Sequence, residues 1–128
     1  MYNTALAIAT VATLVVGGGD DIPPSTLQLE HPNKLYAIEQ AWEFGVDPQE
    51  ILRTVTCESN WHIAAVGDSG AAYSYAQFHR ETFEWMRGES GMTDLEYDSG
   101  RDQLRLMAWG FSQGYQNHWV CWTKLFAS

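Results

Sequence analysis

The chain has few basic residues and no cluster of them. Its 128 residues include 7 Lys and Arg against 16 Asp and Glu, which gives a formal net charge of -9. A nucleic-acid-binding protein carries a basic patch that neutralises phosphates, so the sequence argues against that class and against a nucleic-acid partner. The same charge gives the chain no long-range attraction to anionic polymers.

The sequence also lacks an apolar run of the about 20 residues that a transmembrane helix needs. Residues 5–16 are uncharged and rich in Ala, Val, Leu, Ile and Thr, and small residues follow them. This pattern fits the apolar part of a signal peptide, although no Lys or Arg precedes it. We expect residues 1–19 to be a signal peptide or N-terminal hydrophobic anchor, which leaves membrane anchoring possible. A buried helix or strand is the alternative. Residues 20–32, with three of the four prolines, are expected to be a linker before a domain at 33–128.

Cysteine is scarce too. The two cysteines, Cys57 and Cys121, lack the Cys-x-x-Cys spacing of a metal or redox site. In an exported chain an even count predicts a disulfide, which would close a loop of about 65 residues and contribute roughly 4 kcal/mol in the chain-entropy model. Two separate buried thiols are the alternative. Glu58 and His62 have a spacing that could hold a metal, but no third ligand accompanies them, so neither a metal nor another cofactor is expected.

Aromatic residues, in contrast, are plentiful. Hydrophobic residues make up 45% of the chain and aromatic residues 13%, including six Trp. This is the composition of a globular protein, and the length allows one domain. The indole rings either fill the core or stack on sugar rings in a carbohydrate groove.

Caps and apolar periodicity predict a mainly α domain. Asn33 can cap a first helix with Leu35, Ile38 and Trp42 on its apolar face, and Gly45 is a natural stop. Asp47 followed by proline predicts the start of a second helix over residues 48–59.

The second half of the chain is expected to hold shorter elements. Residues 64–76 are too rich in Gly, Ala and Ser for a regular helix and fit a short hairpin. Residues 82–86 suggest a short helix, and 88–100 a polar loop. Ser99 and Asp102 resemble a capping box that opens a helix ended by Gly114. Its expected apolar face consists of Leu104, Met107, Ala108 and Phe111.

Glu58 is the residue best suited to catalysis. It follows Val55 by three residues on the apolar stripe of the expected second helix, at the C-terminal end. Partial desolvation and the negative end of the helix dipole both raise the pKa of a carboxyl placed there. A glycosidase needs such an acid, protonated near neutral pH, to donate a proton to the leaving oxygen. An exposed Glu at a fraying helix end is the alternative.

Ordered motifs surround Glu58. They are residues 44–48 (FGVDP), 58–61 (ESNW), 65–73 (AVGDSGAAY) and 77–78 (QF). Together they resemble the lytic transglycosylase (SLT-type) branch of the lysozyme-like superfamily. The resemblance is good over residues 34–85 and loose over 101–122.

The resemblance implies a lysozyme-like helical domain with a groove that binds peptidoglycan glycan strands. It implies cleavage of the β-1,4 bond between N-acetylmuramic acid and N-acetylglucosamine. Glu58 matches the acid/base of that family, and Ser59 would join the hydrogen bonding beside it. Gln77 matches the residue that bonds near the reacting sugar, while Tyr75 and Phe78 would line the groove.

The chain departs from the family pattern at three places. Ser74 stands where the family usually has Gly, and Ala72 where it often has Ser. The later Tyr-Asn-Ala-Gly motif is absent, and residues 114–117 are the nearest equivalent, which makes Tyr115 a further candidate for substrate binding. These changes favour one alternative, a non-catalytic peptidoglycan-binding module.

The expected mechanism and cellular location follow from the same resemblance. A hydrolytic muramidase needs a second carboxylate, for which Asp68 and Asp94 are candidates; Asp68 fits equally well as a turn former. Without one, Glu58 alone can close a 1,6-anhydro ring on the muramic acid. We expect a monomer that is exported (periplasmic, secreted or membrane-anchored), or an endolysin encoded by a phage and directed at the wall.

Overall fold

The computed structural model describes residues 31–127, and the chain divides into two units, 1–34 and 35–128. The expected signal peptide or anchor at 1–19, and nearly all of the expected linker at 20–32, lie outside the described residues. No helix within 31–127 is both long enough and apolar enough to cross a membrane.

Helix α3, Pro32–Glu43, buries a different face from the one predicted. It begins at Pro32, so Asn33 lies inside its first turn and is not a cap. Leu35 and Trp42, expected to face the core, are 38% and 49% exposed. The buried positions carry small or polar side chains instead: Ala37, Gln40 and Ala41. Arg105, on the segment 100–112, donates to Gln40 and Glu43 and so turns this side of α3 towards the core.

Helix α4, Pro48–Ser59, has the predicted bounds. The carboxylate of Asp47 accepts a hydrogen bond from the N–H of Gln49, which satisfies one of the free donors of the first turn. Ile51 and Val55 are fully buried. The helix ends at Asn60, whose φ of 50° is left-handed.

A small antiparallel sheet follows α4, where a short hairpin was expected. Strand β1 (Val66–Gly67) pairs with β2 (Ala72–Tyr73), which pairs with β3 (Phe78–His79). The 3-10 turn η1 (Asp68–Gly70) joins the first two strands. Five positive-φ residues, four of them not glycine, shape the connections: Asp68, Ser69, Gly70, Ser74 and Gln77.

Helix α5, Arg80–Ser90, is longer than the predicted segment at 82–86, and the polar loop accordingly begins later than residue 88. Gly88, taken as the start of that loop, lies inside the helix. The buried side chains of Phe83 and Met86 fix the helix on the core, and this packing outweighs the low helical propensity of Gly.

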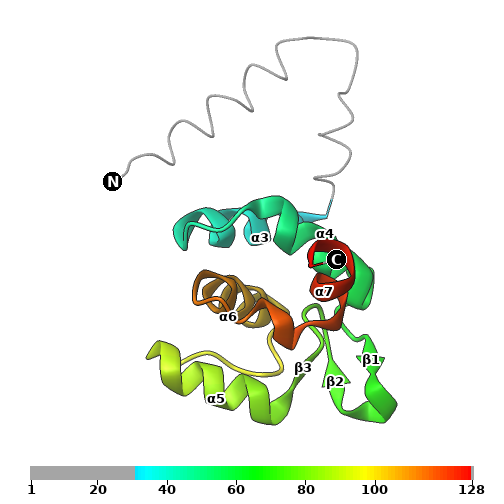
Figure 1. Ribbon diagram of the computed structural model, residues 1–128. Coiled ribbons are helices and arrows are strands. Elements are labelled where there is room, and N and C mark those ends of the chain that lie inside the picture. Colours follow the sequence, from blue (N-terminus) through cyan, green and yellow to red (C-terminus); the bar gives the residue numbers. More distant parts are fainter. Residues whose placement is uncertain (1–30, 128) are drawn as a thin grey trace. The chain divides into compact units, whose positions relative to one another are not determined.

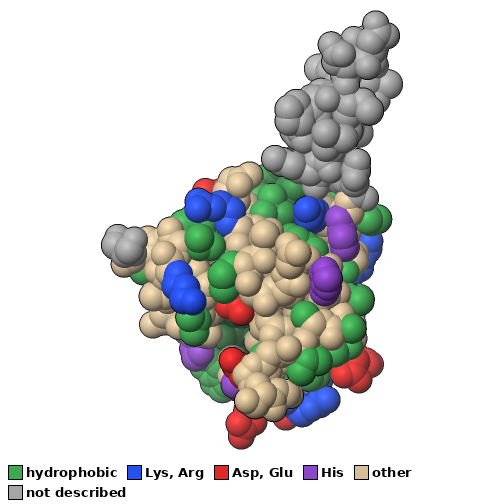
Figure 2. All heavy atoms as spheres, turned by 90° about the vertical axis from the view of Figure 1, so that its right-hand side faces the viewer, with side chains coloured by type: hydrophobic (Ala, Val, Ile, Leu, Met, Phe, Trp, Pro, Cys, Tyr) green, Lys and Arg blue, Asp and Glu red, His purple; other side chains and the backbone are tan. Residues whose placement is uncertain are grey.

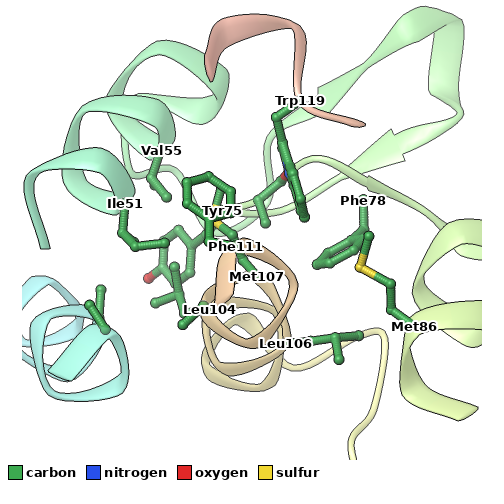
Figure 3. Packing of buried hydrophobic residues seen from close by; sticks show 14 of the residues in the cluster. Ile51, Val55, Tyr75, Phe78, Met86, Leu104, Leu106, Met107, Phe111 and Trp119 are labelled. Atoms are coloured by element: carbon green, nitrogen blue, oxygen red, sulfur yellow. The ribbon is translucent and has the colours of Figure 1, made fainter. Parts of the chain in front are cut away.

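Helix α6, Gly100–Ser112, lies between α3 and α5 at the centre of the domain (Figure 1). Ser99 caps it by accepting from the N–H of Asp102, as predicted. The reciprocal bond of a capping box is absent, because the carboxylate of Asp102 accepts from the N–H of Glu96. All four residues of the predicted apolar face are buried, and Figure 3 shows three of them, Leu104, Met107 and Phe111, in the middle of the core.

The C-terminal elements are η2 (Gln116–His118) and α7 (Val120–Phe126), and α7 lies beside α4 (Figure 1). Trp119, between them, is 3% exposed, and its indole N–H donates to the carbonyl of Ala76 at 2.8 Å. This bond ties the C-terminal segment to the loop between β2 and β3. The domain is mainly α with a short hairpin after α4, as predicted.

Candidate active site

Glu58 is the penultimate residue of α4 and is half-buried. Its Oε2 accepts a hydrogen bond from the backbone N–H of Cys121, at the start of α7, at 3.2 Å. Figure 2 views the side of the domain on which α4, α7 and the sheet lie. The carboxyl of Glu58 is therefore held by a fixed donor from a segment distant in sequence.

Burial sets the acidity of Glu58. Desolvation is the largest influence and raises its pKa above the ordinary value. The hydrogen bond from Cys121 acts in the opposite direction, the negative charge of Asp68 raises the pKa further, and Lys124 lowers it. The net effect is a raised pKa, so the protonated carboxyl persists to higher pH than in an exposed Glu.

The predicted disulfide between Cys57 and Cys121 is present, with the two Cα atoms 5.9 Å apart. It joins α4 to α7. Cys57 directly precedes Glu58, and Cys121 is the residue whose N–H binds the Glu58 carboxylate. The indole N–H of Trp122 adds a 2.8 Å bond to Glu50 on α4. These contacts fix the N–H donor relative to the Glu58 carboxylate.

Ser59 lies beside Glu58 in sequence but is buried, with 8% exposed. Its hydroxyl donates to the carbonyl of Val55 and accepts from the N–H of Trp61, both at 3.2 Å. Ser59 therefore stabilises the end of α4 behind Glu58, and its side chain offers little surface to a substrate.

Gln77 closes the base of the hairpin. Its Nε2 donates to the carbonyls of Ala65 and Ser74, at 3.0 and 2.9 Å. A Cβ on Gly67 would lie 2.4 Å from Oε1 of Gln77, so a larger residue there would force this side chain to move. With Nε2 engaged, Oε1 is the side-chain atom of Gln77 that remains to interact with a ligand.

Asp68 and His79 form a pair that the sequence did not reveal. Oδ2 of Asp68 lies 2.8 Å from Nε2 of His79, and both side chains are exposed. Asp68 is also the carboxylate whose charge raises the pKa of Glu58. Strands of two residues carry no readable register, so nothing in the sequence could have joined Asp68 to His79. Asp94, the other candidate carboxylate, does not act on the pKa of Glu58 but on that of Arg105.

Tyr75 and Phe78 differ from their expected place on the groove wall. Each is only 2% exposed. The ring of Tyr75 packs against Trp61 at 5.6 Å, and that of Phe78 against Trp119 at 5.3 Å. These side chains support the site from the core, and neither presents a face to a sugar.

Tyr115 belongs to a different aromatic cluster. Its ring lies 5.1 Å from Trp85, 5.9 Å from Trp109 and 6.1 Å from His118. These neighbours come from α5, α6 and η2, and the structure gives no contact between Tyr115 and Glu58. Tyr115 is therefore placed in this cluster and not with the residues around the carboxyl.

A half-buried acid held by one backbone donor, with a second carboxylate close enough to act on it, suits proton transfer. No group of three or more His, Cys, Asp or Glu within residues 31–127 is placed to hold a metal ion. The chain matches no family model, no curated protein and no solved structure in the three comparisons made, so any functional assignment depends on the chemistry of this site and on the sequence motifs.

Proposed function

We propose that the protein cleaves the β-1,4 bond between N-acetylmuramic acid and N-acetylglucosamine in peptidoglycan, with Glu58 as its acid/base. The observation that carries the proposal is the state of that carboxyl: half-buried, with a raised pKa and one oxygen held by the N–H of Cys121. The resemblance of the motifs around Glu58 to lytic transglycosylases supplies the substrate class, and a lysozyme-like form of the fold is part of the proposal.

The geometry suits an acid that must also act as a base. With Oε2 bound to the N–H of Cys121, Oε1 is left to donate its proton to the leaving glycosidic oxygen. The N–H then stabilises the carboxylate that forms, which limits how strongly that carboxylate holds the next proton. In the second step the carboxylate takes the proton of the 6-hydroxyl of the muramic acid. That oxygen bonds to C1 and closes a 1,6-anhydro ring, so no water is consumed.

A hydrolytic muramidase is the second candidate, and Asp68 is the observation that favours it. Its charge acts on Glu58 and would also stabilise the positive charge of an oxocarbenium-like transition state. His79, bound to Asp68 at 2.8 Å, would weaken this effect when protonated. The two routes differ in their product, because hydrolysis leaves reducing muramic acid ends.

We further propose that the enzyme acts outside the cytoplasm, as a monomer and without a cofactor, either on the wall of its own cell or as a phage endolysin. The disulfide supports an oxidising compartment, because such bonds persist mainly there.

The test is clearing of purified peptidoglycan by the wild type and by Glu58→Gln, with Glu89→Gln on the exposed surface of α5 as the control. We expect clearing by the wild type and by the control, and a loss of at least about 100-fold in Glu58→Gln, the lower range for a general acid. Equal clearing by Glu58→Gln excludes Glu58 as the acid/base. No clearing by any of the three favours the non-catalytic binding module. Mass spectrometry of the products separates anhydro from reducing ends.

A further inference from the structure

A pocket lies at the end of the η1 turn. It has a volume of about 460 Å³ and is lined by Gly70, Ala71, Tyr73, Arg80, Tyr97 and Asp98. The volume falls within the roughly 300–1,000 Å³ of typical small-molecule sites. None of these six residues contributes to the environment of Glu58 described above.

Two tyrosine rings form one wall of this pocket. The rings of Tyr73 and Tyr97 lie 5.8 Å apart, with 37° between their planes. The hydroxyl of Tyr97 donates to the carbonyl of Phe78, which fixes that ring in place. Gly70 and Ala71 also line the pocket and contribute almost no side-chain volume to it. The guanidinium of Arg80 covers one face of Tyr97, so the ring of Tyr73 is the aromatic surface that this pocket offers to a flat ring.

Arg80 and Asp98 supply polar groups at the same pocket. The guanidinium of Arg80 lies over the ring of Tyr97, 4.3 Å from its centroid. Its Nη2 is 3.8 Å from Oδ1 of Asp98, and both side chains are more than half exposed. Such a long, exposed ion pair contributes little to stability, so donors and acceptors of both residues remain available to a ligand.

This combination selects a neutral sugar over an anion. An aromatic wall packs against the C–H face of a pyranose, and a guanidinium beside a carboxylate offers both a donor and an acceptor to neighbouring hydroxyls. An anionic ligand would meet the carboxylate of Asp98 within a chain of net charge -9. A purely apolar ligand would leave the polar groups of Arg80 and Asp98 without partners.

We propose that this pocket binds one N-acetylhexosamine ring of a glycan strand, separate from the sugars at the bond that Glu58 cleaves. The turn η1 connects the two places, since Asp68 at its start acts on Glu58 and Gly70 at its end lines the pocket. Only the identity of the glycan as peptidoglycan rests on the proposed function; the sugar chemistry of the pocket does not.

The test is an NMR titration of the full chain, ¹⁵N-labelled and carrying Glu58→Gln to prevent turnover, with the neutral β-1,4 tetramer of N-acetylglucosamine. We expect the amide signals of Gly70 and Ala71 to shift on addition of the tetramer. Adding Arg80→Gln or Tyr73→Ala should weaken the binding that these signals report by about fivefold or more, since each removes one contact to the ring. Arg53→Gln is the matched control, because Arg53 also lies over an aromatic ring, that of Phe126, but on α4; it should change the affinity less than twofold.

Each other outcome is informative. Shifts confined to the amides around Glu58 and Cys121 would overturn the pocket and leave the proposed cleavage intact. If the amide signals of the pocket shift but the wild type clears no peptidoglycan, sugar binding at the pocket is supported and the proposed cleavage is rejected. No shift at millimolar tetramer, or a response of Gly70 and Ala71 only to a short acidic peptide, would overturn the sugar assignment. Arg80 is largely exposed, so the Arg80→Gln variant should fold even if Tyr73→Ala does not.

Discussion

Replacing Ser74 by glycine should stabilise the domain, because Ser74 combines two unfavourable features. Its φ is +68°, a left-handed conformation that costs a residue with a Cβ roughly 1 kcal/mol. Its side chain is fully buried, and Oγ has no hydrogen-bond partner among the described residues. A buried hydroxyl without a partner costs about 1–3 kcal/mol.

Two effects oppose the gain. Glycine adds about 0.4–1 kcal/mol of conformational entropy to the unfolded chain. The removed Cβ and Oγ leave a small void, which at about 24 cal/mol per Å³ costs a further ~0.5–1 kcal/mol. The substitution leaves two backbone hydrogen bonds of residue 74 unaffected. Its N–H donates to the carbonyl of Ala65, and its carbonyl accepts from the N–H of Gln77. The balance is a gain of about 1 kcal/mol for Ser74→Gly, equivalent to a Tm about 4–8 °C higher for a domain of this size.

Two matched variants separate these contributions in thermal and urea unfolding. Ser74→Ala removes the hydroxyl but keeps the Cβ at positive φ, so it should gain about as much as Ser74→Gly, because the strain that glycine relieves is nearly offset by the chain entropy it adds. Ser69 is also a serine in the left-handed region, with φ +57°, but it is exposed. Ser69→Gly should therefore stay within about 0.5 kcal/mol of the wild type, since strain relief and chain entropy nearly cancel. If Ser74→Gly were no more stable than the wild type, the assigned cost of the buried hydroxyl would be wrong.

Three further predictions concern the site. Replacing Cys57 and Cys121 by alanine should lower the free energy of unfolding by about 4 kcal/mol, from the 64-residue separation of the pair, as measured by urea titration. Burial raises the pKa of Glu58 in the folded state above its value in the unfolded chain. This carboxyl therefore stabilises the fold fully at pH values below the unfolded-state pKa, and the stabilisation is lost as the pH rises through the folded-state pKa. Glu58→Gln should therefore be more stable than the wild type above neutral pH, and the difference should shrink in acid; a difference independent of pH in unfolding scans would contradict the raised pKa. Gly67→Ala should displace the side chain of Gln77, since its Cβ would lie 2.4 Å from Oε1, and should reduce wall clearing while Gly88→Ala on the open face of α5 does not.

Local signals in the sequence predicted much of the helical scaffold. The Asp47 cap with the following proline defined the bounds of α4, and the spacing of Leu104 to Phe111 defined the buried face of α6. The cap depends on neighbouring residues and the buried face on apolar spacing along one helix, and the sequence displays both directly. The face of α3 was predicted wrongly: Ala37 and Ala41 lie in the core cluster, because Arg105 of α6 binds Gln40 and Glu43 beside them and leaves Leu35 and Trp42 partly exposed.

The site was predictable only in part. Glu58 stands on an apolar stripe, which predicted its half-buried position, and only the motifs around it suggested a catalytic role. Its N–H donor, Cys121, lies 63 residues away, and the Asp68–His79 pair forms across a sheet of two-residue strands. The side chains of Tyr75 and Phe78 were expected beside a substrate because their position next to Gln77 suggested it, but hydrophobic burial determined where they lie.

The distance along the chain between Glu58 and its donor has a consequence for biosynthesis. A ribosome adds about 5–20 residues per second, so several seconds pass between the synthesis of Glu58 and that of Cys121. During that interval a nascent chain already contains the acid but not the peptide group that positions it. Until oxidation joins the two sulfurs, the newly made protein lacks the covalent restraint on this arrangement, so a host that synthesises it in a reducing cytosol would gain a measure of protection from the proposed activity.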